Sequence, residues 1–226
     1  MGHDSRFAKP RQFKKDKLYF HIMKSFYERY WENTDALNDY TYKLKLIKKL
    51  VPEEDNLEVL DFGCGKGAFI KDILSINPTL KITGADISQT AITAARKKLP
   101  KQKFYILTEG GKLPFKDKSF DFILALDVFL HIYDTELIFK EITRVLKHGG
   151  RLLITVPYYG LLKNIVIALI GFDEVYNPRN GEIRFYTKNT LLNEIKAIGL
   201  TPIKFGYFSR FYPFSKAMYC VSKKNR

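Results

Sequence analysis

The sequence has only two cysteines, Cys64 and Cys220, among its 226 residues. Two cysteines so far apart offer neither the disulfide framework of a small secreted domain nor the spacing of a structural zinc site. We therefore expect no bound metal and a protein of the reducing cytoplasm.

Long apolar runs are also missing. The first 17 residues lack the apolar core of a secretion signal. The apolar stretch at residues 161–170 is far shorter than the ~20 residues that a membrane span needs. No internal repeat or low-complexity tract occurs. Because 46% of the residues are hydrophobic, the chain can bury one sizeable core, and we expect one α/β domain with a short extension.

Acidic residues are scarce at both ends of the chain. Residues 1–17 hold six Lys or Arg against two Asp, and residues 195–226 hold seven Lys or Arg with no acid. The two ends thus carry +11 of the formal net charge of +14. Such ends can face nucleic acid, an anionic membrane surface or a phosphorylated substrate, or they can form a plain solvated surface.

The most informative pattern is LEVLDFGCGKG at residues 57–67, an apolar run followed by three alternating glycines. Glycine has no Cβ, so it adopts positive φ easily and lets a ligand lie against the backbone. The apolar residues at 68–74 have helical spacing, which predicts a strand, a loop and a helix in succession. A second predicted strand, KITGAD at 81–86, ends in Asp86, whose carboxylate can accept hydrogen bonds from a ribose diol.

Two cofactor classes use such a loop. The GxGxxA pattern of dinucleotide folds matches Gly63, Gly65 and Ala68, and the (D/E)xGxGxG pattern of S-adenosylmethionine folds matches the residues from Asp61 to Gly67. The loop alone does not distinguish a nicotinamide-dependent oxidoreductase from a methyltransferase.

The segment from Tyr105 to His131, YILTEGGKLPFKDKSFDFILALDVFLH, resembles the central segment of class I S-adenosylmethionine-dependent methyltransferases. RVLKHGGRLLITVP at 144–157 resembles the helix end, glycine turn and fifth strand of the same family, with His148 in place of the usual proline. The resemblance runs from about Leu57 to Pro157. It implies a Rossmann-like, doubly wound α/β fold with a seven-stranded, mostly parallel sheet, an antiparallel last strand and helices on both faces.

The resemblance also implies S-adenosylmethionine as cofactor, S-adenosylhomocysteine as product and a role for each matching residue. Asp61 would orient the glycine loop and help hold the methionine ammonium, Asp86 would accept from the ribose hydroxyls, and Glu109, where an aspartate is usual, would accept from the adenine amino group. Ile87 and Gly110 would lie against the adenine, and Asp127 and Val128 next to the sulfonium. The implied cofactor residues are Asp61, Gly63, Cys64, Gly65, Gly67, Asp86, Ile87, Glu109, Gly110, Asp127 and Val128.

Methyl transfer from a sulfonium depends mainly on alignment of acceptor and methyl group, but an oxygen acceptor also loses a proton. By the same resemblance, His131, four residues after Asp127, is the best-placed candidate for the general base, and histidine is the commonest choice for that role. A structural role in the turn before the next helix is the alternative.

The chain before the glycine loop is predicted to be helical from Lys17 to Pro52 and is crowded with aromatic residues. We divide the protein into a basic, aromatic extension with a lid helix at 1–36 and a methyltransferase domain at 37–226. In the resembling family an N-terminal helix commonly closes over the cofactor, so Tyr27, Tyr30 and Trp31 are substrate or lid candidates. Packing in the core is the other interpretation of the same aromatic residues.

An insertion at about 158–187 separates the fifth strand from the next helix, and loops of this length are usually functional. Its apolar part is expected to be a helix packed on the core, with a lid over an apolar substrate or a patch at a bilayer surface as alternatives. GEIRFYT at 181–187 resembles an element of methyltransferases that act on glycans, lipid-linked intermediates and quinone precursors. Arg184 is therefore a candidate for binding an anionic or hydroxyl-rich acceptor, with pairing to a neighbouring carboxylate as the alternative. Tyr158, at the start of the insertion, is a further substrate candidate.

These observations favour methyl transfer to a small-molecule, glycan or lipid-linked acceptor, at oxygen. An RNA methyltransferase that uses the basic ends is the first alternative, although no NPPY-like motif and no appended RNA-binding module occur. A nicotinamide-dependent oxidoreductase that shares only the glycine loop is the second. We expect a cytoplasmic protein without a transmembrane segment, peripheral at a membrane if its basic ends meet an anionic surface.

Overall fold

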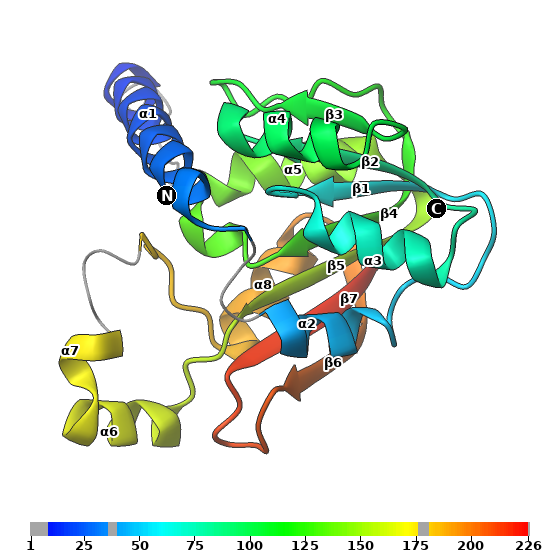
Figure 1. The fold of residues 1–226 in the computed structure, drawn as a ribbon. Helices are drawn as coiled ribbons and strands as arrows, with labels where there is room; N and C mark the ends of the chain where they lie inside the picture. Colours follow the sequence, from blue (N-terminus) through cyan, green and yellow to red (C-terminus); the bar gives the residue numbers. More distant parts are fainter. Residues whose placement is uncertain (1–8, 36–39, 176–180, 226) are drawn as a thin grey trace, which may run out of the picture.

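The computed structural model describes residues 9–35, 40–175 and 181–225 of the chain. Seven strands form one sheet in the order β3-β2-β1-β4-β5-β7-β6 (Figure 1). Strands β1 to β5 pair in parallel, whereas β7 pairs antiparallel with both β5 and β6. This topology confirms the predicted fold. The strands are β1 (Glu58–Phe62), β2 (Lys81–Asp86), β3 (Lys103–Ile106), β4 (Phe120–Leu126), β5 (Leu146–Pro157), β6 (Leu200–Phe208) and β7 (Ala217–Lys224).

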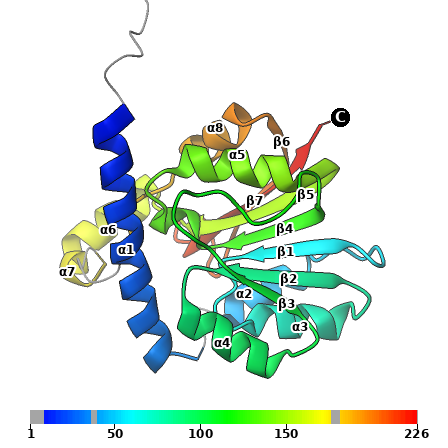
Figure 2. The same ribbon diagram turned by 90° about the horizontal axis from the view of Figure 1, so that it is seen from above.

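Helices cover both faces of the sheet (Figure 2). Helices α2 (Tyr40–Ile47), α3 (Ala68–Ile76) and α4 (Gln89–Lys98) lie on one face, and α5 (Thr135–Val145) and α8 (Lys188–Ala197) lie on the other. Each face has its own apolar core, because successive strand residues point to opposite sides. In β4, for example, Ile123 packs with α5 and α8, whereas Leu124 packs with α2, α3 and α4.

The N-terminal segment, predicted to be helical from Lys17 to Pro52, contains two helices in the structure. It forms α1 (Lys9–Asn33) and α2, which are separate helices. Helix α1 contacts α4 along the edge where the strands end, while α2 contacts α3 on the face of the sheet. One straight helix cannot reach both places, which explains the break.

The insertion after β5 contains α6 (Leu161–Ile170) and the short α7 (Phe172–Val175). The expectation that its apolar residues pack on the core is wrong, because α6 has no buried residue. Both helices lie beside the sheet (Figure 1).

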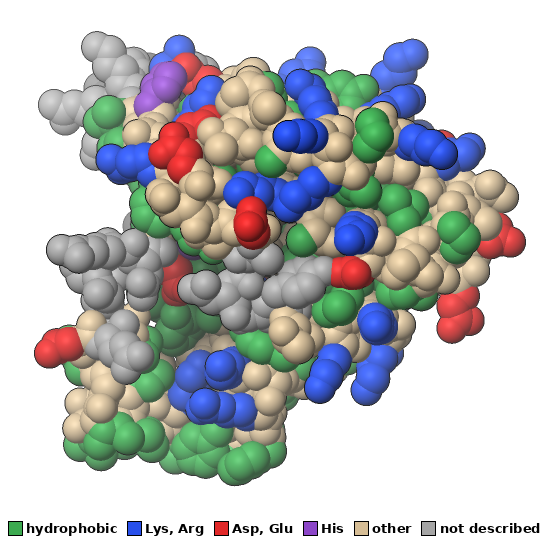
Figure 3. Space-filling view, viewed as in Figure 1, with side chains coloured by type: hydrophobic (Ala, Val, Ile, Leu, Met, Phe, Trp, Pro, Cys, Tyr) green, Lys and Arg blue, Asp and Glu red, His purple; other side chains and the backbone are tan. Residues whose placement is uncertain are grey.

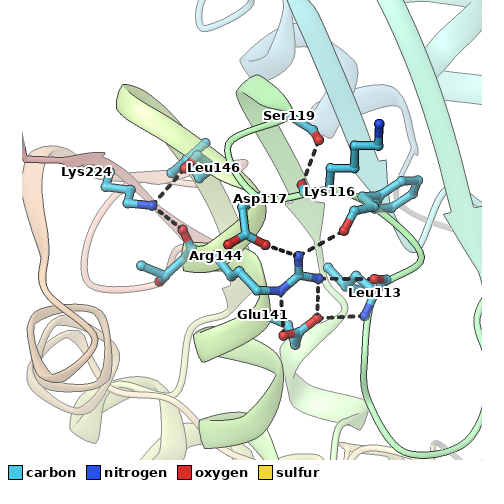
Figure 4. Close-up of polar contacts among 10 residues, drawn as sticks. Leu113, Lys116, Asp117, Ser119, Glu141, Arg144, Leu146 and Lys224 are labelled. Atoms are coloured by element: carbon cyan, nitrogen blue, oxygen red, sulfur yellow. Dashed lines mark hydrogen bonds and ion pairs between the residues drawn. The ribbon is translucent and has the colours of Figure 1, made fainter.

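Arg144 on α5 holds the LPFKD segment at 113–117 in place (Figure 4). Its guanidinium donates to the carbonyl oxygens of Phe115 and Leu113, at 2.9 and 3.1 Å, and pairs with the carboxylates of Asp117 and Glu141, at 2.7 and 2.6 Å. Glu141 also accepts from the backbone N–H of Leu113 at 2.8 Å. Arg144 thus binds the LPFKD segment, which carries much of the family resemblance, to α5.

Candidate functional site

A cavity of about 550 Å³ lies beyond the carboxyl ends of β1, β2 and β4, with α1 across it. The strand order reverses between β1 and β4, and this switch point is where open α/β sheets bind ligands. The cavity is lined by the glycine loop, the ends of the three strands, residues 107–113 and the aromatic side of α1.

The structure brings most of the predicted residues together. Every implied cofactor residue except Gly67 lines this cavity, as do His131, Tyr27, Tyr30 and Trp31. Gly67 precedes α3 in a left-handed conformation, with φ of 75°, and faces Leu99 and Ala95 of the neighbouring chain segment. Its lack of a side chain serves packing between α3 and α4.

The other loop glycines permit close approaches of side chains. Gly63, with φ of 81°, has no room for a Cβ, which would lie 2.3 Å from Cγ2 of Val128. At Gly65, with φ of 51°, a Cβ would lie 2.4 Å from the ring of Trp31. Cys64 between them is buried and packs toward Gly84 of β2. The loop therefore meets both the end of β4 and α1 with bare backbone.

Two buried carboxylates lie behind the loop. Asp86 accepts the backbone N–H of Gly65 and that of Ser88, each at 2.9 Å, and burial raises its pKa. Burial and the charge of Asp86 raise the pKa of Asp61 to about 7. Oδ2 of Asp61 has no hydrogen-bond partner among the described residues. A buried acceptor of this kind fits a cationic ligand group that donates hydrogen bonds.

Helix α1 is anchored at both sides of the cavity. Near its end, Glu28 accepts from the hydroxyl of Ser88 and the backbone N–H groups of Gln89 and Thr90, at 2.7 to 2.9 Å, and so caps α4. Nearer its start, Lys17 pairs with Glu109 at 2.7 Å. The predicted adenine acceptor thus already contacts α1.

Lys43 is a site residue that our sequence reasoning missed. It is 1% exposed, lines the cavity and pairs through Nζ with Oδ2 of Asp127 at 2.5 Å. Asp127 has a φ of 54° and also accepts from the hydroxyl of Thr155 at 2.6 Å. The signal for Lys43 was present, because it stands at helical spacing before Leu46 and Ile47, which are buried.

His131 lies in η1 (Phe129–His131) and lines the cavity next to the last part of the insertion, at Gly181. Its Nδ1 lies 3.0 Å from the carbonyl oxygen of Gly181, so Nδ1 carries the proton and Nε2 is the basic nitrogen. Burial lowers the pKa of this imidazole. Tyr27 packs edge-on against the ring, and burial raises the pKa of the Tyr27 phenol.

Two substrate candidates do not line the cavity. Tyr158 is 7% exposed and packs against Tyr207 and Tyr212. Arg184 donates to the backbone carbonyls of Ile132 and Tyr133 and so ties the insertion to the loop after η1. Glu182, from the same insertion, does line the cavity, and it accepts from the Tyr159 hydroxyl at 2.6 Å.

The chain contains Tyr-x-x-x-Lys spacings, the pattern of a catalytic pair in nicotinamide-dependent oxidoreductases, at Tyr159, Tyr212 and Tyr219. None of these tyrosines, nor the lysine four residues after each, lines the cavity. Among the described residues no group of three or more His, Cys, Asp or Glu is placed to hold a metal ion. No helix in the described part is long and apolar enough to cross a membrane.

Residues 60–154 match the family model described as a methyltransferase domain. The chain is 34% identical over 140 residues to demethylmenaquinone methyltransferase of Thermotoga maritima, with 59% of this chain and 60% of that protein covered. It is 31% identical over 188 residues to an uncharacterised protein of Methanocaldococcus jannaschii, with 79% and 78% covered. It spans only 27% of the length of phosphoethanolamine N-methyltransferase 2 of Caenorhabditis elegans, to which it is 32% identical over 120 residues, 51% of this chain.

The crystal structure of a SAM-dependent methyltransferase from Aquifex aeolicus superposes with a TM-score of 0.63 at 15% identity, over 92% of this chain and 97% of that one. This likeness concerns the fold, whereas the sequence matches concern the family. Both agree with the glycine loop and with the strand order around the cavity. The chain therefore contains, over residues 60–154, a methyltransferase domain of the class I S-adenosylmethionine-dependent family.

Proposed function

We propose that the protein transfers the methyl group of S-adenosylmethionine to an acceptor that binds in the cavity under α1. The observation that carries this proposal is the convergence of Asp61, Asp86 and Asp127 from the ends of three adjacent strands on one cavity with the glycine loop. When bound, S-adenosylmethionine supplies an electrophilic methyl group. The protein has to align the acceptor with it and keep water out.

The residues present fit this cofactor. Oδ2 of Asp61 is buried and would accept from the methionine ammonium, and the bare loop backbone at Gly63 and Gly65 would lie against the methionine and ribose. Asp86 would take the ribose hydroxyls, and Glu109 the adenine amino group. The remaining assignments are Cys64 in the loop, Ile87 and Gly110 beside the adenine, and Asp127 and Val128 near the sulfonium.

The wall of the cavity that α1 forms supports an apolar or aromatic acceptor. Tyr27, Tyr30 and Phe26 of α1 form this wall, and Glu182 adds a polar group. We assign transfer to an oxygen of a small-molecule, glycan or lipid-linked acceptor. His131 would accept the proton through Nε2, because its lowered pKa keeps the imidazole neutral near pH 7.

Calorimetric titration tests the cofactor. S-adenosylmethionine and S-adenosylhomocysteine are added to the wild type and to Asp86→Ala, with NADH as control ligand and Glu53→Ala, which removes an exposed acid, as control variant. We expect micromolar binding of both adenosyl compounds, lost in Asp86→Ala and retained in Glu53→Ala. Binding of NADH, or of none of the three, would contradict the proposal.

A second experiment tests the acceptor. Transfer of an isotopically labelled methyl group is measured with quinone precursors, lipid-linked glycans and RNA. The seven basic residues of 195–226 favour RNA as the second candidate. If only the RNA becomes labelled, RNA is the methyl acceptor and the apolar acceptor is excluded.

A further inference from the structure

The surface formed by α6 and the turn between β6 and β7 is unusually apolar. Leu161, Leu169 and Ile170 on α6 are 76%, 77% and 83% exposed, and Phe211 and Tyr212 in the turn are 74% and 61% exposed. We call these five residues the apolar face. Figure 3 shows hydrophobic side chains gathered along the lower edge of the molecule, where α6 and this turn lie.

The helix and the turn form one surface. Nζ of Lys163 on α6 donates to the carbonyl oxygen of Tyr158 at 2.7 Å and approaches that of Lys216, after the turn, at 3.4 Å. The ring of Tyr158 in turn lies 6.2 Å from that of Tyr212. These contacts hold the apolar side chains of α6 beside those of the turn.

Cations border the apolar face. Arg210 and Lys216 are exposed and flank Phe211 and Tyr212 in the sequence. The C-terminal segment 195–226, which includes them, has seven basic residues and no acid, whereas the exposed acid Asp173 lies on α7. Figure 3 shows Lys and Arg side chains grouped just above the hydrophobic edge.

We propose that the apolar face binds the surface of an anionic lipid bilayer. Aliphatic side chains would enter the region between head groups and acyl chains, Phe211 and Tyr212 would lie at head-group level, and Arg210 and Lys216 would meet lipid phosphates. Helix α6 has 10 residues and cannot cross a bilayer, so it would lie in the interface. The exposed aliphatic residues of α6, with Arg210 and Lys216 beside the neighbouring turn, match the apolar interior and the anionic head groups of such a bilayer.

This surface connects to the cavity through the insertion. Tyr159, two residues before α6, donates to Glu182 at 2.6 Å, and Glu182 lines the cavity. Docking would thus bring a lipid-linked acceptor close to the methyl group, a point that rests on the proposed function. Membrane binding itself does not depend on that function.

Co-sedimentation with vesicles tests the proposal on the full-length protein. Vesicles of phosphatidylcholine with phosphatidylglycerol are compared with vesicles of phosphatidylcholine alone, at low and high salt. We expect binding to the anionic vesicles that weakens with salt. Failure to sediment with either kind of vesicle would overturn the proposal.

Surface variants locate the contact. Leu169→Gln with Ile170→Gln, and separately Phe211→Ser, should each weaken vesicle binding about tenfold or more. Ile76→Gln, at an exposed apolar residue on α3, is the matched control and should bind like the wild type. Arg210→Gln with Lys216→Gln should remove the preference for anionic lipid, unlike Lys97→Gln with Lys101→Gln on the opposite part of the surface.

Two other results would overturn the inference. If only the basic substitutions matter, the protein adsorbs through charge and the apolar face is not inserted. If the apolar substitutions instead abolish a concentration-dependent dimer seen by light scattering while vesicle binding persists, a second copy covers the face. S-adenosylhomocysteine binding is measured for each variant, so that loss of membrane binding is distinguished from failure of the cofactor site.

Discussion

Nζ of Lys43 lies 2.5 Å from Oδ2 of Asp127, so that α2 on the sheet face and the residue after β4 meet in a buried ion pair. Their side chains are 2% and 13% exposed. Removal of one partner leaves the other charge buried without compensation, which is far more costly than removal of both. The pair thus fixes the position of Asp127, a residue with positive φ beside the proposed methyl group.

Lys43→Met should lower the free energy of unfolding by about 3 kcal/mol. The double variant with Asp127→Asn should recover part of the lost free energy of unfolding. Lys45→Met, at an exposed lysine of the same helix, is the control. Urea unfolding followed by circular dichroism measures all four proteins. Equal stability of the Lys43 and Lys45 variants would show that the ion pair contributes nothing.

Asp61 should make stability depend on pH. Its pKa is raised to about 7 by burial and by Asp86, against ~3.9 in an unfolded chain. The folded state therefore binds a proton more tightly, and the free energy of unfolding of the cofactor-free protein falls as pH rises from about 4 to about 7. Asp61→Asn should reduce this decline, and Asp86, whose pKa burial also raises, should account for the part that remains. A decline of the same size in variant and wild type would assign it to other groups.

His131→Ala should reduce kcat about 100-fold with any acceptor that the labelling experiment identifies, and leave S-adenosylhomocysteine binding unchanged. Because burial lowers the pKa of His131 below its ordinary value of 6.5, the wild-type rate should rise with pH in the acid range and should already be level at pH 6.5. His148→Ala, at an exposed histidine, should keep this profile. A full rate in His131→Ala would leave the imidazole a structural role in the turn.

Arg144→Ala should lower the free energy of unfolding by about 2 to 3 kcal/mol, since it removes the guanidinium that donates to two backbone carbonyls and pairs with Glu141. Arg144→Lys should lose most of the same stability, because an ammonium cannot reproduce the planar fork of donors. Thermal melts compare both with Arg29→Ala at the exposed surface of α1. Unchanged melting of the lysine variant would argue against the fork geometry.

Much of the site could be predicted because its determinants are local. The alternating glycines and the acid near the end of each strand follow directly from the sequence, and the resemblance supplied the mostly parallel α/β fold, in which the carboxyl ends of the strands lie together. Lys43 was overlooked because a lysine among other lysines suggests an exposed helix face. The anchoring of α1 by Glu28 depends on a contact with residues about 60 positions away, which no local pattern signals.

For the insertion the prediction failed in the other direction, because residues that were expected to be buried are exposed. Its apolar residues suggested a helix packed on the core, because burial is the usual fate of such residues. Sequence alone does not reveal that both faces of the sheet are already covered, by α2, α3 and α4 on one face and by α5 and α8 on the other, so that α6 has no core surface left to cover.

Trp31 is the single tryptophan of the protein, and its indole lies directly on Gly65 of the cofactor loop. Excitation at a wavelength that tyrosine does not absorb therefore reports from one known point, without labels or engineered dyes. A change in emission on adding a ligand is a change at the contact between α1 and the loop. The protein thus carries its own optical probe of the contact between α1 and the glycine loop.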